Sequence, residues 1–150
     1  MTMKALDKIL DILSTMATQT GSDAPDLKTV MYASPWDANV RLDRKPTPAA
    51  ITYLLKGFEV DTSTGMRHDK VDVEVFFCTR CDLAAKGEET KSKMETVEPI
   101  VDEFISLVYA EKSFKVDGNI VANTAYGKFD TNVCGYSVNF TIVDRVPSCI

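Results

Sequence analysis

Residues 50–77 constrain the fold most strongly, because they contain two apolar runs on either side of a polar segment. The second run predicts a strand with one buried and one mostly solvated face, since Val71, Val73, Val75 and Phe77 alternate with Asp72, Glu74 and Phe76. The first run, residues 50–60, has apolar residues on both faces and is either a strand buried on both sides or a short helix. We predict that the two runs form an antiparallel pair joined by a polar tip, residues 61–70.

Two stripes of apolar residues at spacings of three and four predict helices. The first stripe covers residues 4–17, and Gly21 would end this helix. The second ends near Tyr109 and contains Pro99 near its start. With Thr96 as the N-cap, Pro99 falls in the first turn, where its missing N–H costs nothing; a start near Glu88 would require a kink. We favour the later start.

The remaining segments predict short strands. Between residues 22 and 48, four prolines leave room for a strand near residues 29–33. Asp117-Gly118 predicts a tight hairpin between residues 114–116 and 120–122. Residues 134–142 alternate regularly and predict the last strand. Together these elements predict a single α+β domain over residues 1–150, with an antiparallel or mixed sheet, an N-terminal helix and one main helix packed on it.

Composition narrows the classes of function. A chain of 150 residues with 45% hydrophobic content is long enough to bury one core without disulfides or metals. Its formal net charge of −5 argues against nucleic-acid binding, which draws on clusters of Lys and Arg. No apolar stretch is long enough for a membrane span, and the first residues lack the features of a signal peptide. We therefore expect a cytoplasmic protein whose four cysteines are thiols.

Cys78-Thr-Arg-Cys81 is the one motif that suggests catalysis or metal binding. A redox CxxC opens a helix whose N-terminus lowers the pKa of the first thiol, but residues 82–87 offer at most a short turn. A zinc site needs two more ligands, and only Cys134, Cys149 and His68 are obvious candidates. We interpret the two cysteines as small residues at a strand end, and we expect no metal and no cofactor.

The other candidates for chemistry are equally isolated. His68 is the only histidine, and no serine or cysteine lies in a nucleophile-elbow context beside it. Acidic residues around the polar tip are surrounded by solvated positions, which would keep their carboxylates ionised. Gly127-Lys128 lacks the rest of a phosphate loop. Trp36 is either an interface anchor or a core residue. The sequence therefore predicts a protein that is not an enzyme.

The chain resembles the tail terminator, or tail-completion, proteins of long-tailed bacteriophages and prophages. The resemblance lies in the order and character of the elements: an N-terminal amphipathic helix, a proline-rich loop, the segment Pro48-Ala-Ala-Ile-Thr-Tyr-Leu-Leu, a polar tip and the strand at residues 71–77. A helix ending in Val101-Asp-Glu-Phe-Ile-Ser-Leu107 and a closing pair of strands follow. The resemblance covers most of the chain and implies no catalytic residue.

This resemblance implies a structural protein that forms a ring, often a hexamer, on the end of the tail tube and faces the head connector. The chain would pass from the bacterial cytoplasm into the virion tail. We expect subunit contacts on the hairpin, at Tyr53, Leu54, Phe58, Arg67, His68, Asp69 and Phe76. A cytoplasmic module that binds a protein or a ligand is the first alternative, and a thiol or zinc protein built on Cys78 and Cys81 is the second.

Overall fold

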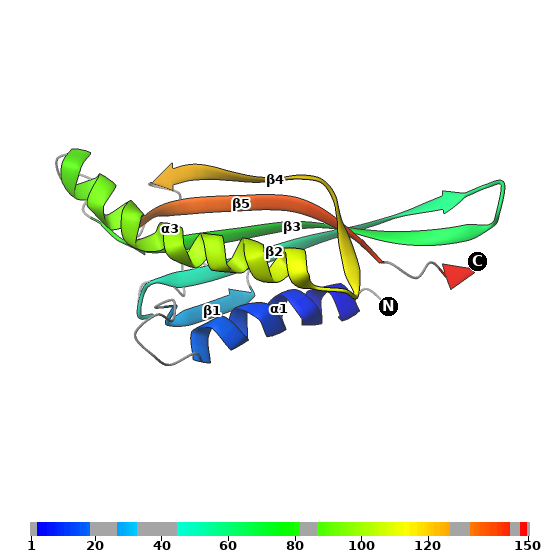
Figure 1. The fold of residues 1–150 in the computed structure, drawn as a ribbon, viewed down its shortest axis with the longest axis horizontal. Helices are drawn as coiled ribbons and strands as arrows, with labels where there is room; N and C mark the ends of the chain where they lie inside the picture. The colour runs from blue at the N-terminus through cyan, green and yellow to red at the C-terminus, as the bar shows by residue number, and fades with distance from the viewer. Residues whose placement is uncertain are drawn as a thin grey trace.

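The computed structural model describes residues 3–18, 27–32, 45–81, 87–126, 133–144 and 148–149. In this part of the chain, a six-stranded sheet carries two helices on one face (Figure 1). The elements in order are α1 (Met3–Thr18), β1 (Thr29–Tyr32), β2 (Ala49–Asp61), β3 (Met66–Arg80), α3 (Gly87–Ala110), β4 (Phe114–Tyr126), β5 (Val133–Asp144) and β6 (Ser148–Cys149). The α+β class, with an N-terminal helix and one main helix on a mixed sheet, is confirmed.

The strands are ordered β1-β2-β3-β5-β4, and β6 pairs with the end of β3. β1 is parallel to β2, whereas all the other pairs are antiparallel. The predicted antiparallel pair is confirmed, since β2 and β3 form one long hairpin from Ala49 opposite Cys78 to Asp61 opposite Met66. The first apolar run is thus a strand and not a helix. The strand expected near residues 29–33 is also confirmed, as β1.

The main core lies between the sheet and the helices. The odd-numbered residues of β3 from Val71 to Phe77 face it, as their alternation predicts. From α3, Phe104 packs between two strands, with ring centroids 5.1 Å from Phe77 and 6.0 Å from Phe140. α1 adds the fully buried side chains of Ile9, Leu13 and Met16. The helical stripes of the sequence therefore mark the faces that bury apolar surface.

A second buried cluster lies on the opposite face of the sheet. Its members come from four strands: Met31, Ala49, Ile51, Phe76, Cys78 and Val133. Phe76 lies opposite Ile51 in the register, and only 2% of its surface is exposed. This face is therefore solvated along part of β3, at Asp72 and Glu74, and buried at the end that contains Phe76 and Cys78.

α3 begins at Gly87, and the predicted start at Thr96 is wrong. Pro99 lies inside the helix, and Figure 1 shows the helix changing direction along its length, as an internal proline requires. Thr96 does not act as an N-cap; its hydroxyl donates to the Lys93 carbonyl oxygen at 2.6 Å. The first turns are held because Met94 and Val97 are buried, at 7% and 0% exposure.

Asp117-Gly118 does not close a hairpin, and that prediction is wrong. β4 continues through it as a single strand, with an irregularity in its pairing between Asp117 and Val121. Gly118 has a φ of 81°, which glycine adopts without strain, so it fits a β-bulge. Both halves of β4 pair with β5, and this long partner strand keeps the chain extended where the dipeptide alone predicts a turn.

The turn between β2 and β3 is shorter than predicted. Only residues 62–65 form it, and Met66 to Lys70 belong to β3. Asp61 stabilises the turn, because its Oδ1 accepts hydrogen bonds from the Ser63 amide at 2.9 Å and the Ser63 hydroxyl at 2.6 Å. Gly65 completes it with a φ of 71°. Most of the expected polar tip is therefore paired strand.

Neither helix in the described part of the chain is long and apolar enough to span a membrane. Four residues that the sequence singled out lie outside the described residues: Gly21, Trp36, Gly127 and Lys128. So does the side chain of Leu54, although its backbone belongs to β2.

Candidate functional site

The far end of the β2–β3 hairpin extends beyond the helices (Figure 1). β5 pairs with β3 only between Lys70 and Arg80. Beyond Lys70, β3 pairs with β2, and its residues Met66 and Arg67 also pair with β6. We call residues 57–69 the hairpin arm. Among the described residues, its strands have fewer neighbours than those of the sheet body, and Phe58 and Glu59 are exposed.

Three of the residues expected to form contacts meet on one side of the arm. Phe58 is 59% exposed, and the Arg67 guanidinium carbon lies 4.0 Å from the centre of its ring. Arg67 Nε donates to Asp69 Oδ1 at 3.0 Å, and Asp69 lies opposite Phe58 in the register. Asp69 thus holds the guanidinium over the ring, a cation–π contact that contributes about 0.5–1 kcal/mol at an exposed site.

The other side of the arm carries an ion pair across the hairpin. Lys70 Nζ lies 2.8 Å from Glu59 Oε2 and 3.9 Å from Asp117 Oδ2 of β4. The hydrogen bond from Lys70 lowers the pKa of Glu59, and the same bond raises the pKa of Lys70. His68 lies opposite Glu59 in the register. These pairs link the base of the arm to the edge strand β4.

The turn of the arm carries a further fixed charge. Hydrogen bonds from the Ser63 hydroxyl and amide lower the pKa of Asp61. The Gly65 amide donates to the Asp61 carbonyl oxygen at 2.7 Å, which closes the turn. The arm therefore presents an exposed aromatic ring, a guanidinium and several ionised carboxylates on a hydrogen-bonded framework.

The remaining predicted contact residues do not join this group. Phe76 is buried in the second cluster and offers no surface to a partner, so its assignment to an interface is wrong. The alternation of the strand could not reveal this, because its neighbours Met31 and Val133 are distant in sequence. Tyr53 lies on the face of the sheet opposite the helices, away from Phe58.

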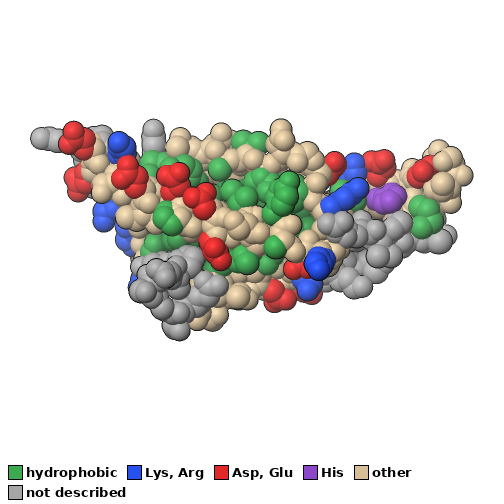
Figure 2. Space-filling model, in the orientation of Figure 1, with side chains coloured by type: hydrophobic (Ala, Val, Ile, Leu, Met, Phe, Trp, Pro, Cys, Tyr) green, Lys and Arg blue, Asp and Glu red, His purple; other side chains and the backbone are tan. Residues whose placement is uncertain are grey.

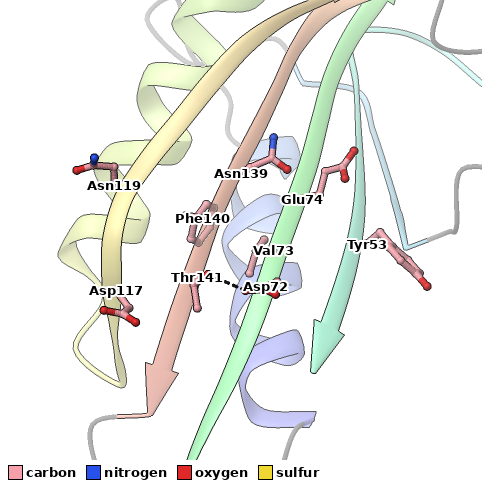
Figure 3. A pocket seen from close by; sticks show the side chains of 9 residues that line it. All are labelled: Tyr53, Asp72, Val73, Glu74, Asp117, Asn119, Asn139, Phe140 and Thr141. Atoms are coloured by element: carbon pink, nitrogen blue, oxygen red, sulfur yellow. Dashed lines mark hydrogen bonds between the residues drawn. The ribbon is translucent and has the colours of Figure 1, made fainter. Parts of the chain in front are cut away.

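Tyr53 lines a hollow of about 380 Å³ on this open face of the sheet. In Figure 3 the helices lie behind the sheet, and the hollow is formed by β2, β3, β5 and β4. Its polar side chains are Tyr53, Asp72, Glu74, Asp117, Asn119, Asn139 and Thr141. The Thr141 hydroxyl donates to Asp72 Oδ1 at 2.6 Å, which ties β5 to β3 across the floor.

Sequence reasoning missed this hollow. Asp72 and Glu74 were expected on a solvated face, but Asp117 and Asn119 were assigned to a turn. Only the cross-strand register brings Thr141 opposite both Asp72 and Asp117. The arrangement offers carboxylate, amide and hydroxyl groups to a polar or basic partner.

The cysteines of the CxxC motif separate onto different sides of the sheet. Cys78 belongs to the second cluster, whereas Cys81 packs with Met94 and Cys134 on the helix side. Burial, followed by a hydrogen bond with Cys81, raises the pKa of Cys134 to about 12. Cys78, Cys81 and Cys134 are free thiols. Among the described residues, no three His, Cys, Asp or Glu side chains are grouped to hold a metal ion.

Charge is unevenly distributed over the helix side of the molecule. Figure 2 shows acidic side chains along α3, whereas basic and acidic side chains and the histidine gather towards the arm. Glu95, Glu98 and Asp102 of α3 are exposed. Burial raises the pKa of Tyr136, and the negative charges of these three carboxylates raise it further.

The comparisons with known proteins found no match for the chain, neither a protein-family model nor a curated protein.

Proposed function

We propose that this chain is a structural subunit of a phage or prophage tail, which forms a ring at the end of the tail tube and contacts the head connector. The proposal rests on the resemblance in element order and on one structural observation, the hairpin arm with its exposed Phe58. An aromatic ring held by a guanidinium, with carboxylates around it, is typical of the centre and rim of a protein interface.

The arm supports this function better than any other described surface. Its length comes from continuous β pairing, so it can reach a neighbour without unfolding. Asp69 is 7% exposed and positions Arg67, which limits the entropy that the arm would lose on binding. A subunit of this kind works by assembly, needs no cofactor, and moves from the cytoplasm into the virion.

Shortening the arm tests the proposal. Because Gly57 lies opposite Lys70, replacing residues 58–69 by Asn-Gly should close the hairpin with a two-residue turn and keep the body folded. Ring formation, measured by sedimentation and by negative-stain images with tail-tube protein present, should be lost. Phe58→Ala should weaken it, and Tyr109→Ala should not, although Tyr109 is 79% exposed. Normal assembly of the shortened protein would contradict the proposal.

A protein- or ligand-binding module is the second candidate, and the hollow on the open face favours it. Its seven polar side chains could bind a polar ligand without any oligomer. Asn139→Ala combined with Asn119→Ala should then abolish binding while the arm variants retain it. The mass of the protein in solution separates the two functions, since the module predicts a monomer or dimer.

A further inference from the structure

In the part of the chain that the structure describes, β4 is an edge strand and no strand pairs with its outer side. It stands at the end of the strand order, and its residues Val121 to Thr124 have exposed side chains, with Val121 at 46%. Residues 118–127 contain no charged residue and no proline. Edge strands that stay unpaired are usually protected by lysines, prolines or bulges within the exposed stretch.

The bulge of β4 lies between Asp117 and Val121, so it does not interrupt the exposed residues 121–124 that follow it. After the irregularity at Asp117, the register runs without interruption from Val121 opposite Asn139 to Tyr126 opposite Cys134. The backbone is therefore regular over this segment and can accept another strand. The helix side of β4 also has apolar surface to bury, since Val116 and Ile120 are only partly buried.

The strand directions indicate which strand would be added. Across the order β1-β2-β3-β5-β4 there is one parallel pair followed by three antiparallel pairs, so β1 and β4 run in opposite directions. Figure 1 shows their arrowheads pointing in opposite directions. A second copy rotated about an axis parallel to the strands would therefore place its β1 antiparallel to β4. Such a head-to-tail contact uses two different surfaces and can close into a ring.

We propose that β4 of one copy pairs antiparallel with β1 of the next copy, so that the sheet continues from subunit to subunit. This rests on the ring-forming function proposed above and adds a second contact to that of the arm. No like charges would meet along residues 118–127, and Tyr32, which is 47% exposed at the end of β1, would gain a neighbour. The backbone hydrogen bonds would fix the register of the ring.

Hydrogen exchange on the unmodified protein tests the pairing directly. In residues 119–126 and 28–32, the amides that have no hydrogen bond within the monomer should exchange at least about tenfold more slowly in the assembled state than in the dilute monomer. Protection of β4 without protection of β1 would overturn the assignment of β1 as its partner. Unchanged exchange in both segments would overturn strand addition altogether.

Charge on the edge provides the second test. Val121→Lys with Asn123→Lys alters two exposed side chains, so the monomer should fold normally, as judged by circular dichroism. Ring formation should fall at least tenfold, while the matched variant Ser92→Lys with Ser106→Lys, at exposed sites on α3, should assemble normally. If the β4 variant assembles normally and the shortened arm does not, this inference fails and the proposed function stands. A wild-type protein that stays monomeric in the presence of tail-tube protein would contradict both the proposed ring and the pairing of β4 with β1.

Discussion

Gly135 of β5 lies so close to Phe77 of β3 that a β-carbon on the glycine would overlap the Phe77 carbonyl oxygen and lie 2.8 Å from its carbonyl carbon. The atoms in the way belong to the backbone of the neighbouring strand, which cannot move without separating β3 from β5. Gly135 therefore makes the central strand pair possible by its lack of a side chain.

Gly135→Ala should destabilise the protein by about 3 kcal/mol or more, because the added methyl group forces the two strands apart. Gly57→Ala is the matched control, since a β-carbon at Gly57 meets nothing within 4 Å, and its effect should stay below about 1 kcal/mol. Urea unfolding of both variants measures the difference. Equal stabilities of the two variants would contradict the close approach of Gly135 to the Phe77 backbone.

Phe104→Ala should cost about 3–5 kcal/mol, because the ring is fully buried between Phe77 and Phe140 and its removal leaves a cavity. Tyr109→Ala on the same helix should change stability by less than about 0.5 kcal/mol, since the tyrosine is 79% exposed. Chemical denaturation of both proteins tests this. A small effect at Phe104 would contradict the packing of α3 on the sheet.

The raised pKa of Cys134 predicts a loss of stability at alkaline pH. Its pKa is about 12 in the folded protein against an ordinary value of 9.0, so the unfolded chain releases this proton first. The contribution of the protonated Cys134 thiol to the free energy of unfolding is fully present below pH 9, and it is lost as pH rises from about 9 towards 12. Urea unfolding at pH 7, 9 and 10 should therefore show the wild type losing stability relative to Cys134→Ala. A constant difference between the two proteins would contradict the burial of this thiol.

The sequence correctly predicts the elements whose apolar pattern repeats over several residues of one segment. The alternation of Val71 to Phe77 and the helical stripe ending in Met16 are local patterns, and both predict the faces that are buried. The start of α3 was missed because a proline in the first turn is locally the better choice, and only tertiary contacts of Met94 and Val97 hold the longer helix. Likewise, Asp117-Gly118 by itself predicts a turn, but β5 pairs along both halves of β4 and no hairpin forms there.

In the candidate site too, local contacts could be predicted from the sequence, whereas contacts set by strand pairing could not. Arg67 and Asp69 are two residues apart on one strand, so their neighbourhood could be expected from the sequence. The contact of Arg67 with Phe58 depends on the register of the hairpin, and the hollow around Asn139 depends on four strands at once. The same long-range register buries Phe76 beside Ile51, which no local pattern could show.

The proposed function requires the chain to assemble with copies of itself, and the mass of the protein in solution measures that assembly. Sedimentation should be measured over a range of concentrations, with and without tail-tube protein. We expect a closed oligomer, six copies in the hexamer that the resemblance implies, and its loss when residues 58–69 are replaced by Asn-Gly. A wild-type protein that remains monomeric at every concentration, alone and with tail-tube protein, would contradict assembly into a ring.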